Sequence, residues 1–202
     1  MTGRTAEVEF WFDFASTYSY LSAMRIAQAA KDAEATVRWR PFLLGPIFAA
    51  QGWTTSPFNL YPAKGRYMWQ DMQRLCAARG LALVQPPGFP QNGLQAARVA
   101  LAALGGPKGP EFCRAVFIEQ FVHGADIAQE KTILRCLDKT GLPASLLDSA
   151  RDPVLKTSLR TQTETAQDLG IFGAPSFLVG KDLFWGDDRL EMALEEARRV
   201  VN

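Results

Sequence analysis

The segment that decides the fold reads Phe10-Trp11-Phe12-Asp13-Phe14-Ala15-Ser16-Thr17-Tyr18-Ser19-Tyr20-Leu21. Its apolar first part belongs to a buried strand predicted over residues 8–12, which turns sharply at residues 13–16 and enters a helix running to about Lys31. Unpaired backbone N–H groups and the positive end of the helix dipole converge at the first turn of a helix. That position favours an anion such as a thiolate, and the residue placed there is Ser16.

The sequence on either side extends this segment into a sheet. Residues 36–40 alternate in polarity as a strand does, and Pro41 ends the alternation. A strand, a helix and a second strand with a short return predict a right-handed unit with parallel strands. Near the other end, apolar runs at 176–179 and 183–185 are separated by Gly180-Lys181-Asp182, which predicts a hairpin. An amphipathic helix is expected over 187–201.

The middle of the chain has helical patterns only. We expect a short helix over 46–51, a loop over 52–62, and helices over 63–80, 94–104, 111–123, 129–140, 144–150 and 154–169. The sequence therefore predicts an α/β fold: a four-stranded mixed sheet with flanking helices, formed by residues 1–45 and 170–202, that carries a large all-helical inserted domain, residues 46–169.

Composition excludes several classes of partner. The 202 residues are 48% hydrophobic and 21% charged, with a formal net charge of +1. These values are ordinary for a soluble protein, and the near-neutral charge does not favour nucleic acid or a membrane surface. No apolar run approaches the roughly 20 residues that span a bilayer. Residues 1–9 lack the apolar core of a signal peptide, so we expect a cytoplasmic protein.

Cysteine and histidine are sparse. Cys76, Cys113 and Cys136 form no CxxC pair, which is typical of a reducing compartment and of small buried residues on helices. His123 is the only histidine, so His-rich metal sites are excluded and we expect no metal. A Ser-His-Asp triad would have to use His123, which the pattern places at the end of a helix.

Two places near strands allow both a structural and a functional interpretation. Ser16 is either a plain helix N-cap or a hydrogen-bond donor to an external thiolate. Pro175, in Gly173-Ala174-Pro175-Ser176, is either a trans proline that starts an edge strand, which the local pattern favours, or a cis proline. A cis proline would leave the N–H and C=O of Ala174 free to pair with an extended, peptide-like ligand.

Two helix starts allow the same choice. Asp187 and Asp188 are N-cap residues of the last helix, or they bind the amine and carboxylate of a small zwitterion together with the backbone. Lys64 lies just inside the start of the helix at 63–80, where a cation is electrostatically unusual. It is either solvated or the partner of a bound carboxylate.

Taken together, these motifs resemble one family. The chain is similar along nearly its whole length to 2-hydroxychromene-2-carboxylate isomerases and to kappa-class glutathione transferases, members of the thioredoxin-like superfamily that also includes the periplasmic disulfide oxidoreductases. The motifs that carry the resemblance are the segment at residues 12–21, Arg40-Pro41-Phe42-Leu43-Leu44-Gly45, Lys64-Gly65-Arg66-Tyr67, Phe89-Pro90-Gln91-Asn92, Gly173-Ala174-Pro175-Ser176-Phe177 and Phe184-Trp185-Gly186-Asp187-Asp188-Arg189-Leu190.

The resemblance implies a thioredoxin-like fold, a homodimer, and glutathione as the cofactor. Ser16 matches the catalytic serine that holds the glutathione sulfur as a thiolate. Ala174 matches the residue before the cis proline, here Pro175, whose backbone pairs with the cysteinyl part of glutathione. The remaining matches are Asp187 and Asp188 for the γ-glutamyl end, Lys64 near the glycyl carboxylate, and Asn92 near a polar position on the substrate side.

Two residues depart from the family pattern. Gly52-Trp53 stands where the family often has Gly-Asn, and Asn59 follows a little later. Asp187 stands where asparagine or serine is usual. An additional carboxylate there would repel the γ-glutamyl carboxylate unless it faces away or pairs with the amine of the ligand.

The activity that the resemblance implies is isomerisation of 2-hydroxychromene-2-carboxylate, or a similar aromatic pyruvate, by reversible addition of the glutathione thiolate. A flat substrate would need an aromatic pocket, for which the candidates are Phe42, Trp53, Tyr67, Trp69 and Phe89, although a plain core role is the better explanation for at least half of them. The alternatives are a transferase that consumes glutathione and a non-catalytic thiol-binding or peptide-binding protein. A disulfide oxidoreductase is disfavoured because no cysteine stands at the helix start.

Overall fold

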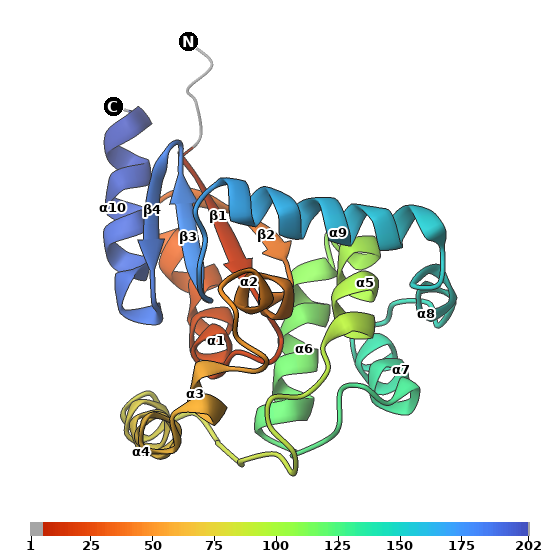
Figure 1. Cartoon of the computed structure of the whole chain (residues 1–202). Coiled ribbons are helices and arrows are strands. Elements are labelled where there is room, and N and C mark those ends of the chain that lie inside the picture. Colours follow the sequence, from red (N-terminus) through yellow and green to blue (C-terminus); the bar gives the residue numbers. More distant parts are fainter. Residues whose placement is uncertain (1–5, 202) are drawn as a thin grey trace.

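A four-stranded mixed sheet forms the centre of the computed structural model, which describes residues 6–201 (Figure 1). The strands β1 (Ala6–Phe12), β2 (Ala35–Pro41), β3 (Ser176–Val179) and β4 (Asp182–Trp185) lie in the order β2-β1-β3-β4. β1 and β2 are parallel, with Phe10 opposite Trp39, whereas β3 is antiparallel to both β1 and β4. The predicted fold class, including the parallel pair and the hairpin, is confirmed.

The sheet has two different faces because side chains alternate along each strand. Val8, Phe10 and Phe12 are fully buried on one face, where they share a core with α1 (Thr17–Asp32) and α10 (Leu190–Val201). Trp11 points to the opposite face and belongs to a smaller cluster with Phe42, Ile47, Ala166, Ile171 and Leu178. That second face is covered in part by α9 (Pro153–Asp168), which contributes Ala166.

The helices between β2 and β3 share the core of the sheet. They are α2 (Leu44–Ala50), α3 (Pro57–Leu60), α4 (Pro62–Ala78), α5 (Leu94–Ala103), α6 (Gly109–Phe121), α7 (Glu130–Lys139), α8 (Ser145–Ser149) and α9. The ring of Phe117 on α6 lies 5.0 Å from that of Phe14 and 5.9 Å from that of Phe12, measured between centroids. This aromatic cluster joins the inserted helices to the sheet in one core. The predicted division into two domains, at 45/46 and 169/170, therefore stays a prediction.

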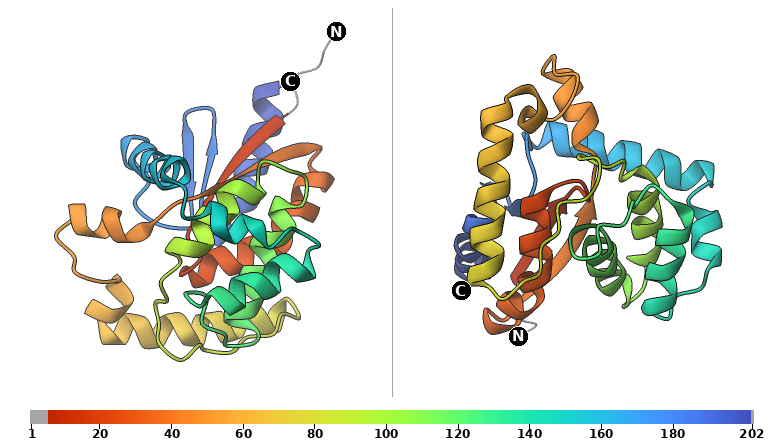
Figure 2. Two further views of the ribbon diagram at one scale, coloured as in Figure 1. Left: turned by 90° about the vertical axis from the view of Figure 1, so that its right-hand side faces the viewer. Right: turned by 90° about the horizontal axis from the view of Figure 1, so that it is seen from below.

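The inserted helices lie in two groups (Figures 1 and 2). α5, α6 and α7 stand together beside β2, whereas α4 lies apart and packs along α1. Two side-chain contacts fix α4 there: the Tyr18 hydroxyl donates to Asp71 at 2.9 Å, and the Thr17 hydroxyl lies 3.3 Å from the sulfur of Met68. The helix that begins directly after Ser16 therefore has α4 as a neighbour at its first turn.

Several predicted helix boundaries differ from the observed ones, and the prediction over 52–62 is wrong. The loop expected over 52–62 contains α3, and α4 already begins at Pro62. The Ser56 hydroxyl caps α3 by accepting a hydrogen bond from Phe58 N–H at 3.3 Å, and Pro57 and Pro62 each occupy a first helical turn, where a missing N–H has no cost. The helix expected to reach residue 123 ends at Phe121. Among residues 6–201, no helix is long and apolar enough to span a bilayer.

Candidate active site at the start of helix α1

Ser16 is both a helix cap and a donor across the chain. It precedes α1 with extended backbone, and its Oγ accepts a hydrogen bond from Ser19 N–H at 3.2 Å. The same hydroxyl donates to the carbonyl oxygen of Ala174 at 2.9 Å, over a separation of 158 residues. The N-cap interpretation of Ser16 is therefore confirmed. Donation to an external thiolate stays a prediction.

The Ala174–Pro175 peptide is cis. The local pattern predicted trans, which is wrong, and the resemblance implied cis, which is confirmed. The carbonyl of Pro175 accepts a hydrogen bond from Gly186 N–H at 3.0 Å, so the loop before β3 is tied to the turn that opens the last helix. Gly186 has φ +108°, a backbone conformation that favours glycine. A Cβ at this position would lie 2.6 Å from Oδ1 of Asp188.

Asp13 supports the turn that presents Ser16. Its carboxylate accepts hydrogen bonds from Ala15 N–H and Leu44 N–H, both at 2.7 Å, and its backbone carbonyl accepts one from Ser16 N–H at 3.0 Å. Burial raises the pKa of Asp13, against the effect of the two backbone hydrogen bonds, which favour the ionised form. Asp13 is not among the predicted site residues, although an aspartate between a strand and a helix N-cap is a recognisable turn signal.

The two aspartates of the last helix start differ sharply in their surroundings. Asp187 is buried, and its carboxylate accepts hydrogen bonds from Ser22, Arg25 and Arg79. It faces the protein interior, which is one of the two arrangements expected for an additional carboxylate at this position. The side chain of Asp188 is 72% exposed and contacts Arg189 at 2.7 Å. Of the pair, only Asp188 presents a carboxylate to solvent. No sequence pattern indicated that Arg25 and Arg79 would contact Asp187.

Two residues predicted on α4 lie on its exposed surface. Lys64 is exposed, with its ammonium 6.0 Å from the ring centroid of Tyr61, and Tyr67 is 58% exposed. Burial raises the pKa of Tyr18, two residues after Ser16, and its hydrogen bond to Asp71 of α4 raises it further.

The remaining predicted residues have structural partners. Trp53 packs against Phe48 with ring centroids 5.6 Å apart, and the amide oxygen of Asn92 accepts a hydrogen bond from Leu94 N–H at 3.0 Å at the start of α5. Phe42 is fully buried, so its assignment to an aromatic pocket is wrong. Trp69 and Phe89 contact each other, with centroids 5.0 Å apart. Within residues 6–201, no hydrogen bond joins Ser16 to Lys64, Trp53, Tyr67 or Asn92.

The three cysteines are not near this helix start. All are buried as free thiols in the helical part of the chain. Burial raises the pKa of each thiol, that of Cys136 to about 12. A buried thiol with a raised pKa is a poor nucleophile. A sulfur at Ser16 would therefore have to come from a bound molecule.

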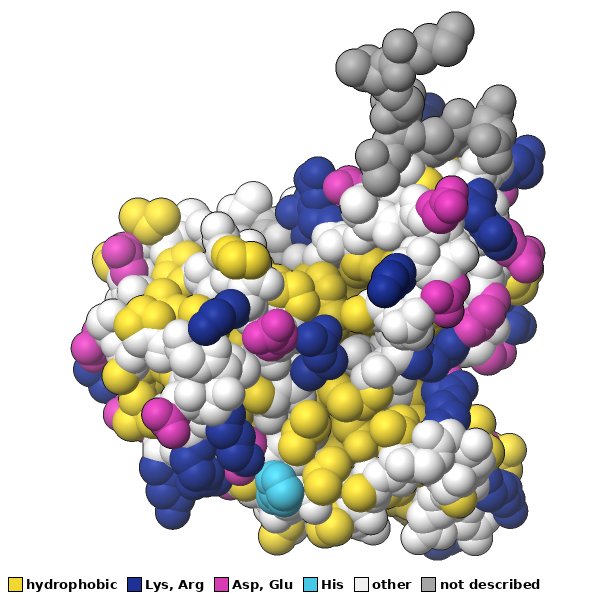
Figure 3. Space-filling model, turned by 180° about the vertical axis from the view of Figure 1, so that it is seen from behind, with side chains coloured by type: hydrophobic (Ala, Val, Ile, Leu, Met, Phe, Trp, Pro, Cys, Tyr) yellow, Lys and Arg dark blue, Asp and Glu magenta, His cyan; other side chains and the backbone are white. Residues whose placement is uncertain are grey.

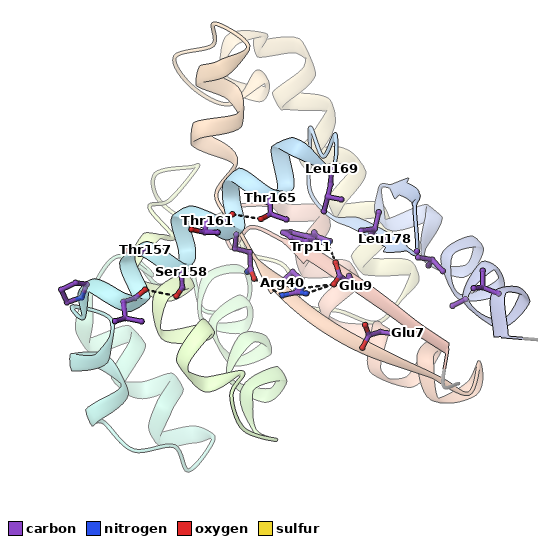
Figure 4. A pocket seen from close by; sticks show the side chains of 17 residues that line it. Glu7, Glu9, Trp11, Arg40, Thr157, Ser158, Thr161, Thr165, Leu169 and Leu178 are labelled. Atoms are coloured by element: carbon purple, nitrogen blue, oxygen red, sulfur yellow. Dashed lines mark hydrogen bonds and ion pairs between the residues drawn. The ribbon is translucent and has the colours of Figure 1, made fainter. Parts of the chain in front are cut away.

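A large hollow of the surface lies elsewhere. It is a groove of about 1300 Å³ on the second face of the sheet, between α9 and α10 (Figure 4). Trp11 and the ion pair of Glu9 with Arg40 form its floor, and Thr161 and Thr165 of α9 line one side. None of the residues predicted for catalysis or cofactor binding lines it. Seen from behind relative to Figure 1, the surface has acidic and basic side chains interspersed, and hydrophobic side chains gather near the histidine (Figure 3).

Comparisons with known proteins agree with this geometry. A family model described as the DsbA-like thioredoxin domain matches residues 7–197. A 2-hydroxychromene-2-carboxylate isomerase of Pseudomonas putida is 30% identical, over 94% of this chain and 93% of the relative. Glutathione S-transferase kappa 1 of Rattus norvegicus is 25% identical, over 92% of this chain and 88% of the relative.

A solved structure supports the same assignment. The structure of a selenomethionine 2-hydroxychromene-2-carboxylate isomerase superposes with a TM-score of 0.85 at 26% sequence identity, covering 96% of this chain and 95% of that one. The serine-capped helix, the cis proline and the helical insertion thus occur together in a chain whose similarity to these enzymes extends from end to end. The chain belongs to the DsbA-like thioredoxin family and, within it, to the family of 2-hydroxychromene-2-carboxylate isomerases.

Proposed function

We propose that this protein is a glutathione-dependent isomerase that acts on 2-hydroxychromene-2-carboxylate or a similar aromatic or conjugated pyruvate. The observation that carries the proposal is the contact between Ser16 and Ala174: a hydroxyl at a helix N-terminus lies 2.9 Å from the carbonyl before a cis proline. No cysteine is at hand to use this position for disulfide exchange. The homodimer implied by the resemblance and the cytoplasmic location expected from residues 1–9 stay predictions.

The residues present fit glutathione. Ser16 and the first turn of α1 would stabilise its thiolate, since both a hydroxyl donor and the helix dipole favour a negative charge. The backbone of Ala174 would pair with its cysteinyl residue, as an added strand pairs with a sheet edge. Asp188 has an exposed carboxylate for the γ-glutamyl amine, and Lys64 an exposed ammonium for the glycyl carboxylate. Asp187 acts indirectly, by fixing the helix start that carries Asp188.

Bound glutathione supplies a thiolate that adds reversibly to the conjugated carbon of the substrate, so that a double bond becomes a single bond that can rotate. Ser16 keeps the sulfur ionised near neutral pH, where a free thiol with a pKa of about 8.5 is mostly protonated. Tyr67, Trp53 and Asn92 are proposed on the substrate side. Of these, Tyr67 has the most exposed aromatic ring.

The test combines calorimetric titration with glutathione and a spectrophotometric isomerisation assay. Wild type should bind glutathione at millimolar concentration or below, and activity should require it without net consumption. Ser16→Ala should lower kcat by about 10²-fold, as loss of a donor to a reacting anion does elsewhere. Ser158→Ala is the matched control, because that exposed hydroxyl donates only to the Val154 carbonyl within α9. Absence of glutathione binding would remove the proposal.

A second candidate is a glutathione transferase, favoured by the similarity to the rat kappa-class enzyme. The same site would then form a stable thioether. Product analysis separates the two functions: a conjugate that accumulates in proportion to the glutathione consumed identifies a transferase, whereas recovery of free glutathione identifies the isomerase. A third reading, a binding protein without catalysis, predicts that Ser16→Ala keeps glutathione affinity and leaves the thiol titration unchanged.

A further inference from the structure

The hydrogen-bonding capacity of the Ser16 hydroxyl is already used. A serine hydroxyl has one proton to donate. The carbonyl oxygen of Ala174, 2.9 Å from Oγ, can only accept, so this proton lies between the two oxygens. A lone pair of Oγ takes the N–H of Ser19 at 3.2 Å. In the structure as it stands, Ser16 has no proton left for a third group.

The proposed function requires the Ser16 hydroxyl to donate this same proton to the sulfur of glutathione. Ser16 can donate to a thiolate only after its hydroxyl has turned away from Ala174. The Ala174 carbonyl would then lose its partner in a half-buried place, which is unfavourable unless another donor replaces the hydroxyl. Water can replace the hydroxyl only in part, because Ala174 is half-buried and the adjacent Ser16 is only 9% exposed.

A peptide ligand itself supplies a hydrogen-bond donor that can replace the Ser16 hydroxyl. An extended cysteinyl residue that pairs with the backbone of Ala174 brings its own N–H to the carbonyl, as in strand addition. We propose that the ligand's cysteinyl N–H displaces the Ser16 hydroxyl from Ala174, so that the hydroxyl becomes a donor to sulfur only for thiols on a peptide backbone. This inference rests on the proposed function and adds a selection rule to it: the site discriminates among thiols by activating them, in addition to binding them.

The experiment compares glutathione with a depsipeptide analogue in which an ester oxygen replaces the N–H between the γ-glutamyl and cysteinyl residues. The analogue keeps the size and the charges of glutathione but accepts where glutathione donates. The measured quantity is the thiolate fraction of the bound ligand, from ultraviolet absorbance against pH. We expect the thiolate fraction at pH 7 to rise at least tenfold on binding for glutathione, and to rise less than threefold for the analogue.

Ser16→Ala supplies the control, because without the hydroxyl the two ligands should show the same small rise. Should the analogue bind too weakly to saturate, the ratio of wild-type to Ser16→Ala kcat/KM decides: about 10² with glutathione, and less than threefold with the analogue or with 2-mercaptoethanol. An analogue activated as strongly as glutathione, or an equal Ser16→Ala loss with all thiols, overturns this inference alone. Glutathione that binds without any rise in thiolate fraction overturns the proposed function as well.

Discussion

Arg79 and Asp187 join the end of α4 to the start of the last helix: Nη2 of Arg79 lies 2.6 Å from Oδ2 of Asp187. Arg25 of α1 contacts the other carboxylate oxygen at 3.2 Å, and Ser22 donates to that oxygen at 2.9 Å. One buried carboxylate thus holds three elements that surround the proposed site. Its position in the sequence, beside Asp188, gave no sign of this difference.

Asp187→Asn should destabilise the fold. The amide keeps one acceptor but leaves the positive charges of Arg25 and Arg79 without a buried counter-charge. Because both guanidinium groups are about one-quarter exposed, we expect a loss of about 2–3 kcal/mol, at the lower end for a broken buried pair. Urea unfolding measures it.

Asp188→Asn is the matched control. The exposed Asp188 should change the free energy of unfolding by less than about 0.5 kcal/mol, as surface pairs do. Its effect should instead appear as weaker glutathione binding. Equal destabilisation by the two substitutions would refute the division of roles between these neighbours.

Asp13→Ala should also destabilise the protein, for a different reason. The substitution leaves Ala15 N–H and Leu44 N–H without their acceptor in a buried turn. At about 1–3 kcal/mol for each of the two unsatisfied groups, we expect a total loss of about 2–6 kcal/mol in guanidinium unfolding. Asp126→Ala is the comparison, because Asp126 makes the same kind of contact, to Ala128 N–H at 2.9 Å, on an exposed loop. A loss no larger than that of the control would contradict the assignment.

Gly173→Ala should disturb the site through Trp185. A Cβ on Gly173 would lie 2.4 Å from Nε1 of Trp185, so the indole or the loop before Ala174 has to move. We expect a shift in tryptophan fluorescence and at least tenfold weaker glutathione binding. Gly45→Ala should change neither, since no atom outside its own helix lies within 4 Å of the added carbon. Unchanged fluorescence and affinity in Gly173→Ala would show that the loop is more adaptable than its packing indicates.

Glu119→Gln should show a defined pH dependence. Burial opposes ionisation of Glu119, but hydrogen bonds from Lys139 at 2.6 Å and Arg135 at 3.0 Å outweigh it and lower its pKa. Its ionised form therefore contributes stability above the unfolded-state pKa of about 4.3, and that contribution is lost as the pH falls through the lower folded-state pKa. Since both cations are about half exposed, screening limits the expected gap to about 1 kcal/mol at pH 7.

Thermal unfolding from pH 7 to pH 3 measures this gap between wild type and Glu119→Gln, which should close in acid. Glu130→Gln is the matched control, because its fully exposed carboxylate pairs with Arg151 in solvent and should produce no measurable gap. A gap that persists at pH 3 would mean that Glu119 acts by packing and not by charge.

The sheet and most helices could be predicted because their signals are local. The apolar run Val8–Phe12 and the Gly180-Lys181 turn indicate a strand and a hairpin without reference to distant contacts. The loop around α3 was misjudged, although Ser56 and Pro57 are helix-start signals, because a four-residue helix offers no periodicity to read. The position of Ser16 was predictable for the same local reason, since a hydroxyl before an amphipathic run marks a helix N-cap.

What could not be predicted depends on tertiary contacts. Burial of Phe42 against Trp11, and of Asp187 between Arg25 and Arg79, is decided by residues far apart in the chain. The hydrogen bond from Ser16 to Ala174 spans 158 residues and joins two segments that each had a plainer local explanation.

The burial of Cys76, Cys113 and Cys136 has a consequence for the resistance of the protein to thiol oxidation. In the proposed reaction the reacting thiol belongs to a molecule that dissociates after use. An oxidant that reaches this thiol would consume the dissociable cofactor and form no mixed disulfide with the protein, because a mixed disulfide requires an accessible protein thiolate. Spent cofactor is exchanged by diffusion, whereas a damaged side chain would require synthesis of a new chain. With serine in place of cysteine at this position, oxidation of the reacting thiol damages the dissociable cofactor, which can be replaced, and not the protein chain.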